Sequence, residues 1–189
     1  MRSLPTLALA LPLACALLAA APAQAQPKRL GEHGSWAAAT QGEGAQKICY
    51  AFARASKAEG VPGRAADNVM LVVTHRPQGR DQVALQSGYA YPRQADGAPD
   101  PVQLSVGNRT LPFFTAGSSA FAREGRAAVA ALRNGREVVA KGPGPNGRGQ
   151  VSDTFPLAGF GAAYDAISKE CPAPAPAPAS GGRGGPPRR

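Results

Sequence analysis

The sequence predicts an all-β domain, an antiparallel β-sandwich or barrel-like sheet, with two short helices. One helix is expected before the penultimate strand and the other at the C-terminal end of the domain. Short segments of strand length alternate large residues with small or polar ones, and only two segments repeat apolar residues at helical spacing. Turn signals recur about every ten to fifteen residues, which favours antiparallel hairpins over a parallel α/β sheet.

Strands are predicted along most of the chain between residues 35 and 157. Residues 68–75 form a β-branched run that is typical of a buried strand. Gly107-Asn108 is a hairpin turn signal, and Pro156 indicates a sheet edge or a strand end. The predicted strands cover residues 35–40, 47–54, 68–75, 81–91, 102–106, 110–115, 118–121, 137–140 and 151–157.

The alternation in residues 47–54 assigns side chains to the two faces of one strand. Ile48, Tyr50 and Phe52 share a face, and Cys49 lies on the other. Because large apolar side chains are usually buried, we expect the aromatic residues to pack in the core and assign none of them to a ligand. These residues are Trp36, Tyr50, Phe52, Phe113, Phe114, Phe121, Phe155, Phe160 and Tyr164.

Two helices complete the predicted fold. Residues 123–134 are rich in alanine and place Val129 and Leu132 three positions apart, with Gly135 as a helix stop. The second helix leads up to Cys171. Its apolar residues at helical spacing are Phe160, Ala163, Tyr164 and Ile167.

The N-terminal residues 1–25 have the pattern of a secretory signal peptide. Arg2 precedes an apolar run over 7–21, and Ala23-Gln24-Ala25 is a small-x-small signal for cleavage before Gln26. The run is shorter than the roughly 20 residues that span a bilayer, so no transmembrane segment is expected after cleavage. The protein is therefore expected in the periplasm or secreted. Residues 26–33 are polar and are predicted to be flexible, and residues 34–171 form a single β-sandwich domain.

Cysteine usage agrees with export. A lipid-modified Cys15 is disfavoured because Pro12 stands where such a signal has Leu, and because Cys15 lies inside the apolar run. The mature chain then keeps only Cys49 and Cys171, which in an oxidising compartment most simply form one disulfide; two free buried thiols are the alternative. A bridge closing so long a loop contributes at most roughly 4–5 kcal/mol.

Net charge and the C-terminal residues bear on the partner. The chain has a net charge of +9; Arg2 and three tail arginines lie outside residues 26–171, which leaves 17 basic and 12 acidic residues and a net charge of +5. No basic face with interleaved aromatics is visible, so nucleic acid is not an expected partner. Residues 172–189, PAPAPAPASGGRGGPPRR, are predicted to be a disordered tail. Two alternatives are open for this tail. Either it has no function, or its arginines contact an anionic cell-wall polymer. The arginines are Arg183, Arg188 and Arg189.

The sequence predicts no catalytic residue, no cofactor and no metal site. The two cysteines, with His33 and His75, lack the spacing of a tetrahedral metal site. An envelope hydrolase using His75 with a nearby Ser or Asp is the alternative, although His75 is expected at the surface, at a strand end. Asp153 and Asp165 are expected to be exposed polar residues.

The glycine-rich segment 142–149, GPGPNGRG, is the only one in the chain that resembles a phosphate-binding loop. It lacks the Gly-Lys-Ser/Thr ending, and a strand follows it instead of a helix. A hairpin loop is therefore predicted here.

Several segments together resemble the invasion-associated locus B family of exported proteobacterial proteins. After an export signal come Gly34-Ser35-Trp36, Ile48-Cys49-Tyr50 and a Val-rich strand, and a helix precedes Asn134-Gly135-Arg136. The most specific piece is Phe155-x-Leu157-x-Gly159-Phe160, which leads into the final helix and Cys171. The resemblance covers about residues 34–171. It implies a periplasmic or envelope β-sandwich without a known catalytic centre.

These observations together predict a non-enzymatic exported envelope protein. It is expected to act as a binding or structural module, with a link to host-cell interaction implied by the family name. Its expected partner is an unknown envelope protein or a cell-wall polymer.

Overall fold

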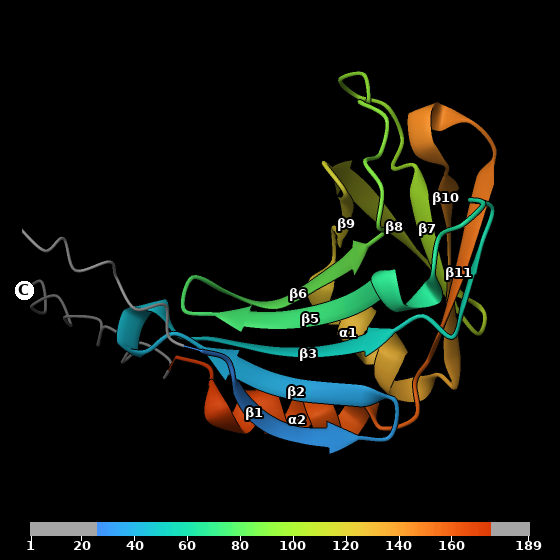
Figure 1. Cartoon of the computed structure of the whole chain (residues 1–189). Helices are drawn as coiled ribbons and strands as arrows, with labels where there is room; N and C mark the ends of the chain where they lie inside the picture. Colours follow the sequence, from blue (N-terminus) through green and yellow to red (C-terminus); the bar gives the residue numbers. More distant parts are fainter. Residues whose placement is uncertain (1–25, 175–189) are drawn as a thin grey trace, which may run out of the picture.

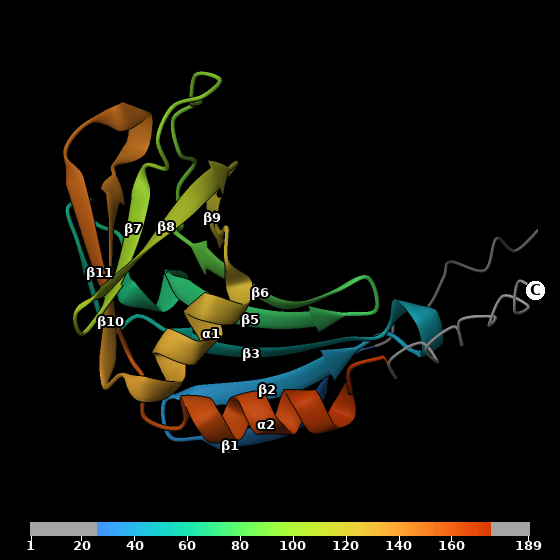
Figure 2. The same cartoon turned by 180° about the vertical axis from the view of Figure 1, so that it is seen from behind.

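The computed structural model describes residues 26–174, which form one strongly curved sheet and two helices (Figures 1 and 2). The helices are α1 (Gly125–Asn134) and α2 (Phe160–Glu170). The strands are β1 (Lys28–His33), β2 (Trp36–Gln41), β3 (Ile48–Arg54), β4 (Lys57–Glu59), β5 (Met70–Arg76), β6 (Gly79–Gln86), β7 (Val102–Val106), β8 (Arg109–Ala116), β9 (Ser119–Ala122), β10 (Glu137–Pro143) and β11 (Gln150–Pro156).

The eleven strands follow the order β1-β2-β3-β5-β6-β9-β8-β7-β10-β11-β4, and neighbouring strands are antiparallel. Both helices pack on the side of the sheet that faces the viewer in Figure 2, α2 against β1, β2 and β3 and α1 against β6. Helix α1 precedes the penultimate strand, and α2 ends the domain. The predicted all-β class with two short helices is confirmed.

The first strand lies in a segment that was expected to be flexible. Residues 28–33 pair with β2 from Lys28 opposite Thr40 to His33 opposite Trp36, with a bulge between Arg29 and Gly31. The sequence of β1 lacks apolar alternation, and this edge strand is held to β2 by backbone hydrogen bonds along one side. Charged side chains on such an edge also discourage pairing with a second molecule.

The two faces of β3 are the reverse of the prediction. Cys49, Ala51 and Ala53 are buried, whereas Tyr50 and Phe52 point away from the helices and are partly exposed. The prediction that Tyr50 and Phe52 belong to the core is therefore wrong. Helix α2 packs on the face with the small residues, because small side chains let a helix come close to a sheet.

Phe114 and Phe121 also depart from the predicted core. Phe114 is 36% exposed and stacks on the partly exposed Phe121 across the β8–β9 pair. Tyr164 is partly buried at the border of the core. Four aromatic residues are fully buried, as predicted: Trp36, Phe113, Phe155 and Phe160.

Helix α2 starts where the chain touches the end of β1. Gly159 adopts a left-handed conformation with φ of 91°, and a Cβ atom there would lie 1.8 Å from the His33 carbonyl oxygen. Only glycine fits both conditions. Trp36 anchors the same corner, because its ring meets Phe160 edge-on and its Nε1 donates to the Pro156 carbonyl over 3.0 Å.

Candidate functional site

A β-bulge in the β5–β6 hairpin brings polar side chains together at the edge of the core. Thr74 pairs with Gln82 and Arg76 with Gly79, so the single residue His75 faces both Arg80 and Asp81. Asp81 has a φ of 57°, a left-handed conformation that is uncommon outside glycine. The bulge turns Asp81 toward His75, and bulges often re-aim side chains in this way.

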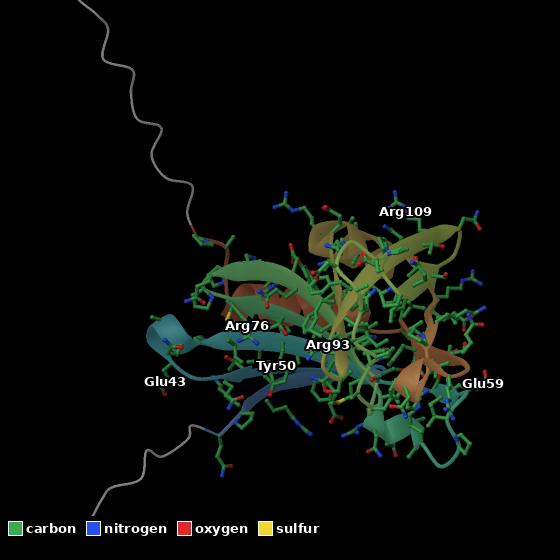
Figure 3. All side chains as sticks on the ribbon, turned by 90° about the horizontal axis from the view of Figure 1, so that it is seen from above. Glu43, Tyr50, Glu59, Arg76, Arg93 and Arg109 are labelled. Atoms are coloured by element: carbon green, nitrogen blue, oxygen red, sulfur yellow. A yellow bond between two sulfur atoms is a disulfide. The ribbon has the colours of Figure 1, made fainter. Side chains whose placement is uncertain are left out.

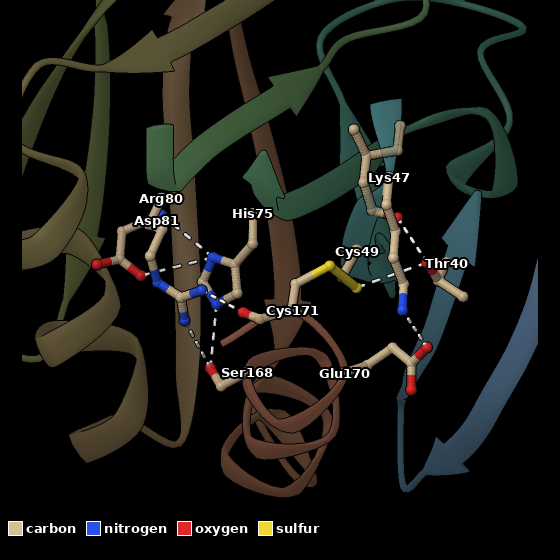
Figure 4. Close-up of a disulfide and its surroundings, with 10 residues drawn as sticks. Thr40, Lys47, Cys49, His75, Arg80, Asp81, Ser168, Glu170 and Cys171 are labelled. Carbon is tan, nitrogen blue, oxygen red and sulfur yellow. Dashed lines mark hydrogen bonds and ion pairs between the residues drawn. A yellow bond between two sulfur atoms is a disulfide. The ribbon is translucent and has the colours of Figure 1, made fainter. Parts of the chain in front are cut away.

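His75 is fully buried, contrary to the prediction of a surface position, and it has polar partners on both ring nitrogens (Figure 4). Its Nε2 lies 3.0 Å from the Ser168 hydroxyl oxygen on α2. The Asp81 backbone N–H donates to Nδ1 over 3.3 Å, and the Asp81 carboxylate is 3.8 Å from the same atom. A serine, a histidine and an aspartate are thus neighbours, as a hydrolase would require.

The hydrogen bonds nevertheless give this histidine the wrong tautomer for a general base. Nδ1 accepts from the Asp81 backbone, so the neutral ring carries its proton on Nε2 and donates it to Ser168. A base that activates Ser168 needs a free lone pair on Nε2. Arg80 also donates to the Ser168 oxygen, over 3.4 Å. That oxygen therefore accepts hydrogen bonds from both His75 and Arg80.

Electrostatics keep the ring of His75 neutral. Burial, followed by the charge of Arg80, lowers the pKa of His75 below its usual 6.5, and Asp81 opposes this in part. The Tyr164 hydroxyl donates to the Asp81 carboxylate over 2.6 Å, and burial raises the pKa of Tyr164. The cluster therefore holds α2 to the β5–β6 hairpin through neutral His75 and partly buried hydrogen bonds.

The predicted Cys49–Cys171 disulfide is present beside this cluster. Cys49 pairs directly with His75 across β3 and β5, and Cys171 follows the last residue of α2. Arg80 donates to the Cys171 carbonyl, and Lys47 forms an ion pair of 2.6 Å with Glu170 (Figure 4). Covalent and polar contacts thus fix the C-terminal end of α2.

A second buried polar group lies on β11, far from β5 and His75 in the strand order. Asp153 was expected to be exposed, but its side chain is 2% exposed and forms a bidentate pair with Arg64, which is 4% exposed. Burial raises the pKa of Asp153, and the Arg64 hydrogen bonds and charge lower it in part. Arg64 also donates to the Ser87 carbonyl over 2.9 Å and lies over the Tyr89 ring. The pair thus holds two connecting loops against β11, the one that contains Arg64 and the one that contains Ser87 and Tyr89.

Asp165, the other predicted polar carboxylate, is exposed on α2 as expected and pairs with Arg133. Asp153 and Asp165 thus bind different arginines. The glycine-rich segment 142–149 connects β10 to β11, so its prediction as a hairpin loop is confirmed.

The sheet face without helices carries a continuous row of apolar side chains. Residues directly opposite one another on six neighbouring strands are all apolar and partly exposed. Sequence reasoning assigned the aromatic members to the core and did not group these residues. We call them the outer stripe: Ala37, Phe52, Val72, Ala84, Phe121 and Phe114.

Polar and charged residues border the outer stripe, and Figure 3 labels two of them, Tyr50 and Arg76. Tyr50 lies beside the outer stripe on β3, at a ring distance of 6.1 Å from Phe52. Arg54 and Arg76 end β3 and β5 as exposed residues, and the Arg123 guanidinium lies over Phe114. An exposed apolar surface with a polar border is typical of an interaction site.

Other predictions for the site fall partly outside the described residues. The predicted signal peptide, with Cys15, and the tail arginines Arg183, Arg188 and Arg189 lie outside the described residues, in 1–25 and 175–189. Within residues 26–174, no three His, Cys, Asp or Glu side chains gather as they would to hold a metal ion. In the same range, no helix is long and apolar enough to cross a bilayer.

The fold and site define a disulfide-linked antiparallel β domain with a polar cluster that anchors α2 and an apolar outer face. A family model described as Invasion associated locus B (IalB) protein matches residues 36–168, and the chain belongs to this family. The structure is also similar to the crystal structure of invasion associated protein B from Bartonella henselae, with a TM-score of 0.49 and 18% identity. That similarity covers 74% of this chain and 95% of the other. The search of curated proteins found no match.

Proposed function

We propose that this chain is an exported, non-enzymatic envelope protein that binds a partner protein through its outer stripe. The outer stripe is the observation that carries the proposal. Antiparallel sheets with one solvated face usually place polar residues on that face, whereas here six strands in succession place apolar ones. Covering such a surface with a partner removes apolar area from water.

Two other functions have less support. Hydrolysis at His75 would require the opposite tautomer and a free Ser168 hydroxyl. Binding of a cell-wall polymer would use Arg183, Arg188 and Arg189, so it belongs to the tail and needs its own experiment.

The test is photo-crosslinking in the native bacterium. The mature protein carries p-benzoylphenylalanine in place of Phe114, the most exposed member of the outer stripe. A matched control carries it in place of Lys169, which is exposed on α2. Both forms are made with and without residues 172–189, and capture is repeated during contact with host cells because the family description refers to invasion.

We expect a discrete protein to be captured at Phe114 in both the full and the shortened chain, and not at Lys169. Capture that requires residues 172–189 would transfer the function to the tail. Absence of any discrete product at Phe114 would overturn the proposal.

A further inference from the structure

The charge around the outer stripe indicates what kind of partner it accepts. We infer that the stripe binds an acidic amphipathic helix of a partner protein, whose apolar side covers the stripe and whose carboxylates pair with Arg54 and Arg76. This inference rests on the proposed function and specifies its partner.

Charge complementarity is the first argument. The outward positions of β2, β3, β5, β6 and β9 contain arginine but no carboxylate. The exposed Glu32, which lies opposite Ala37 on the edge strand β1, already pairs with Arg29. Arg54 contacts the Asp67 carbonyl, and Arg76 donates to the Gln82 side chain over 3.1 Å. Within residues 26–174, neither guanidinium forms an ion pair with a carboxylate. The outward residues are Ala37, Ala39, Gln41, Ile48, Tyr50, Phe52, Arg54, Met70, Val72, Thr74, Arg76, Gln82, Ala84, Gln86, Ser119 and Phe121.

The dimensions of the stripe are the second argument. Neighbouring strands lie about 4.8 Å apart, so a row that crosses six strands is roughly 24 Å long. A helix rises about 1.5 Å per residue, and roughly 16 residues would therefore cover the row. Because β3 and β5 are antiparallel, Arg54 at the end of β3 and Arg76 at the end of β5 lie on opposite sides of the stripe. A helix with carboxylates on both borders of its apolar side would meet both arginines.

The shape of the stripe favours a protein partner over an anionic membrane. Membrane-bound proteins insert projecting apolar side chains below the headgroups. Here Phe114 is the only large apolar residue of the described chain that reaches 36% exposure, and Phe52, Val72 and Phe121 are less exposed. Such a surface offers apolar contact area but no side chain that projects far enough to insert into a membrane. The partner must therefore supply apolar side chains of its own.

Binding of designed probes to the purified mature protein tests the inference. One probe is a 16-residue amphipathic helical peptide with leucines on one side and glutamates along both borders. A matched peptide has lysines in place of the glutamates, and vesicles of phosphatidylglycerol form the third probe. Amide chemical shifts in an isotope-labelled protein report which residues each probe contacts, and residues of α2 such as Lys169 provide the internal control.

We expect the acidic peptide to shift the amides of Phe52, Val72 and Phe121, with affinity at least about tenfold higher than that of the lysine peptide. The double substitution Arg54→Glu with Arg76→Glu should reverse this preference. Both positions are exposed, so an unchanged thermal midpoint is expected and verifies folding.

Equal affinity for the two peptides, or shifts produced by vesicles alone, would overturn the inference. Neither result would affect the proposed function, which fails if no protein is captured at Phe114 or if capture requires residues 172–189. A captured segment without carboxylates would likewise reject the acidic helix while retaining the binding module.

Discussion

The two faces of the β2–β3–β5 part of the sheet differ in what covers them. Under α2 the side chains are small, as in Ala38, Ala51 and Ala53, and they are fully buried. On the outer face Tyr50 and Phe52 are large and partly exposed. The face that a helix approaches needs small residues for close packing, so residue size alone does not identify the buried side of a strand.

The largest expected effect on stability comes from removing the disulfide that ties α2 to the covered face of the sheet. Replacing both cysteines, Cys49→Ala with Cys171→Ala, should lower the free energy of unfolding by about 2–5 kcal/mol, because the end of α2 is no longer tied to β3. Chemical denaturation measures this change. Reductant should destabilise the native protein by a similar amount and leave the double variant unaffected. An unchanged midpoint in the variant would show that the polar contacts suffice.

Enlarging a residue under α2 should have the next largest effect. Ala51→Leu should cost about 1–3 kcal/mol, because the added atoms have no space between β3 and α2. The matched change on the outer face, Val72→Leu, should alter stability by no more than about 0.5 kcal/mol. Similar losses at the two positions would contradict the difference between the faces.

Lowering the pH should reduce the free energy of unfolding through His75. The effect should be smaller than those of the two changes above, because only one group ionises. The pKa of His75 is lowered in the folded state, so the unfolded chain takes up a proton first as the pH falls below about 6.5. Stability is then full above pH 6.5 and decreases as the pH falls from there toward the folded-state pKa. Denaturation measured between pH 7.5 and 5 on the native protein and on His75→Gln tests this, since the variant should lack the decrease.

The smallest effect on stability is expected on the outer face. Phe52→Thr should cost less than about 1 kcal/mol, which is the range of a cross-strand pair. The same substitution should nevertheless abolish most crosslinking from Phe114. Loss of stability without loss of capture would instead make Phe52 a structural residue.

The features that the sequence predicted depend on local patterns. Cys49 and Cys171 are the only cysteines outside the predicted signal peptide, so the prediction of their pairing needed no knowledge of the fold. Ala163 and Ile167 revealed the buried side of α2 through helical spacing. The residues of 48–53 were correctly divided between two faces, but the choice of the buried face depended on where α2 packs.

The candidate site could not be predicted in the same way. Asp81 reaches His75 only because the bulge adds one residue to β6, and Ser168 arrives from a helix 93 positions away along the chain. The outer stripe depends on strand order, since Ala84 and Phe121 become neighbours only when β6 pairs with β9. The alternating alanines of β3 were the one local signal that its large residues face outward.

The position of the disulfide affects how the protein would respond to proteolysis. Cys49 and Cys171 are 122 residues apart, so the segment 93–101, which contains no strand or helix, lies within a covalently closed ring. A single cut there would open the ring without releasing either fragment. The sheet and both helices would stay joined through sulfur, and the outer stripe would stay in place after the backbone had been cut.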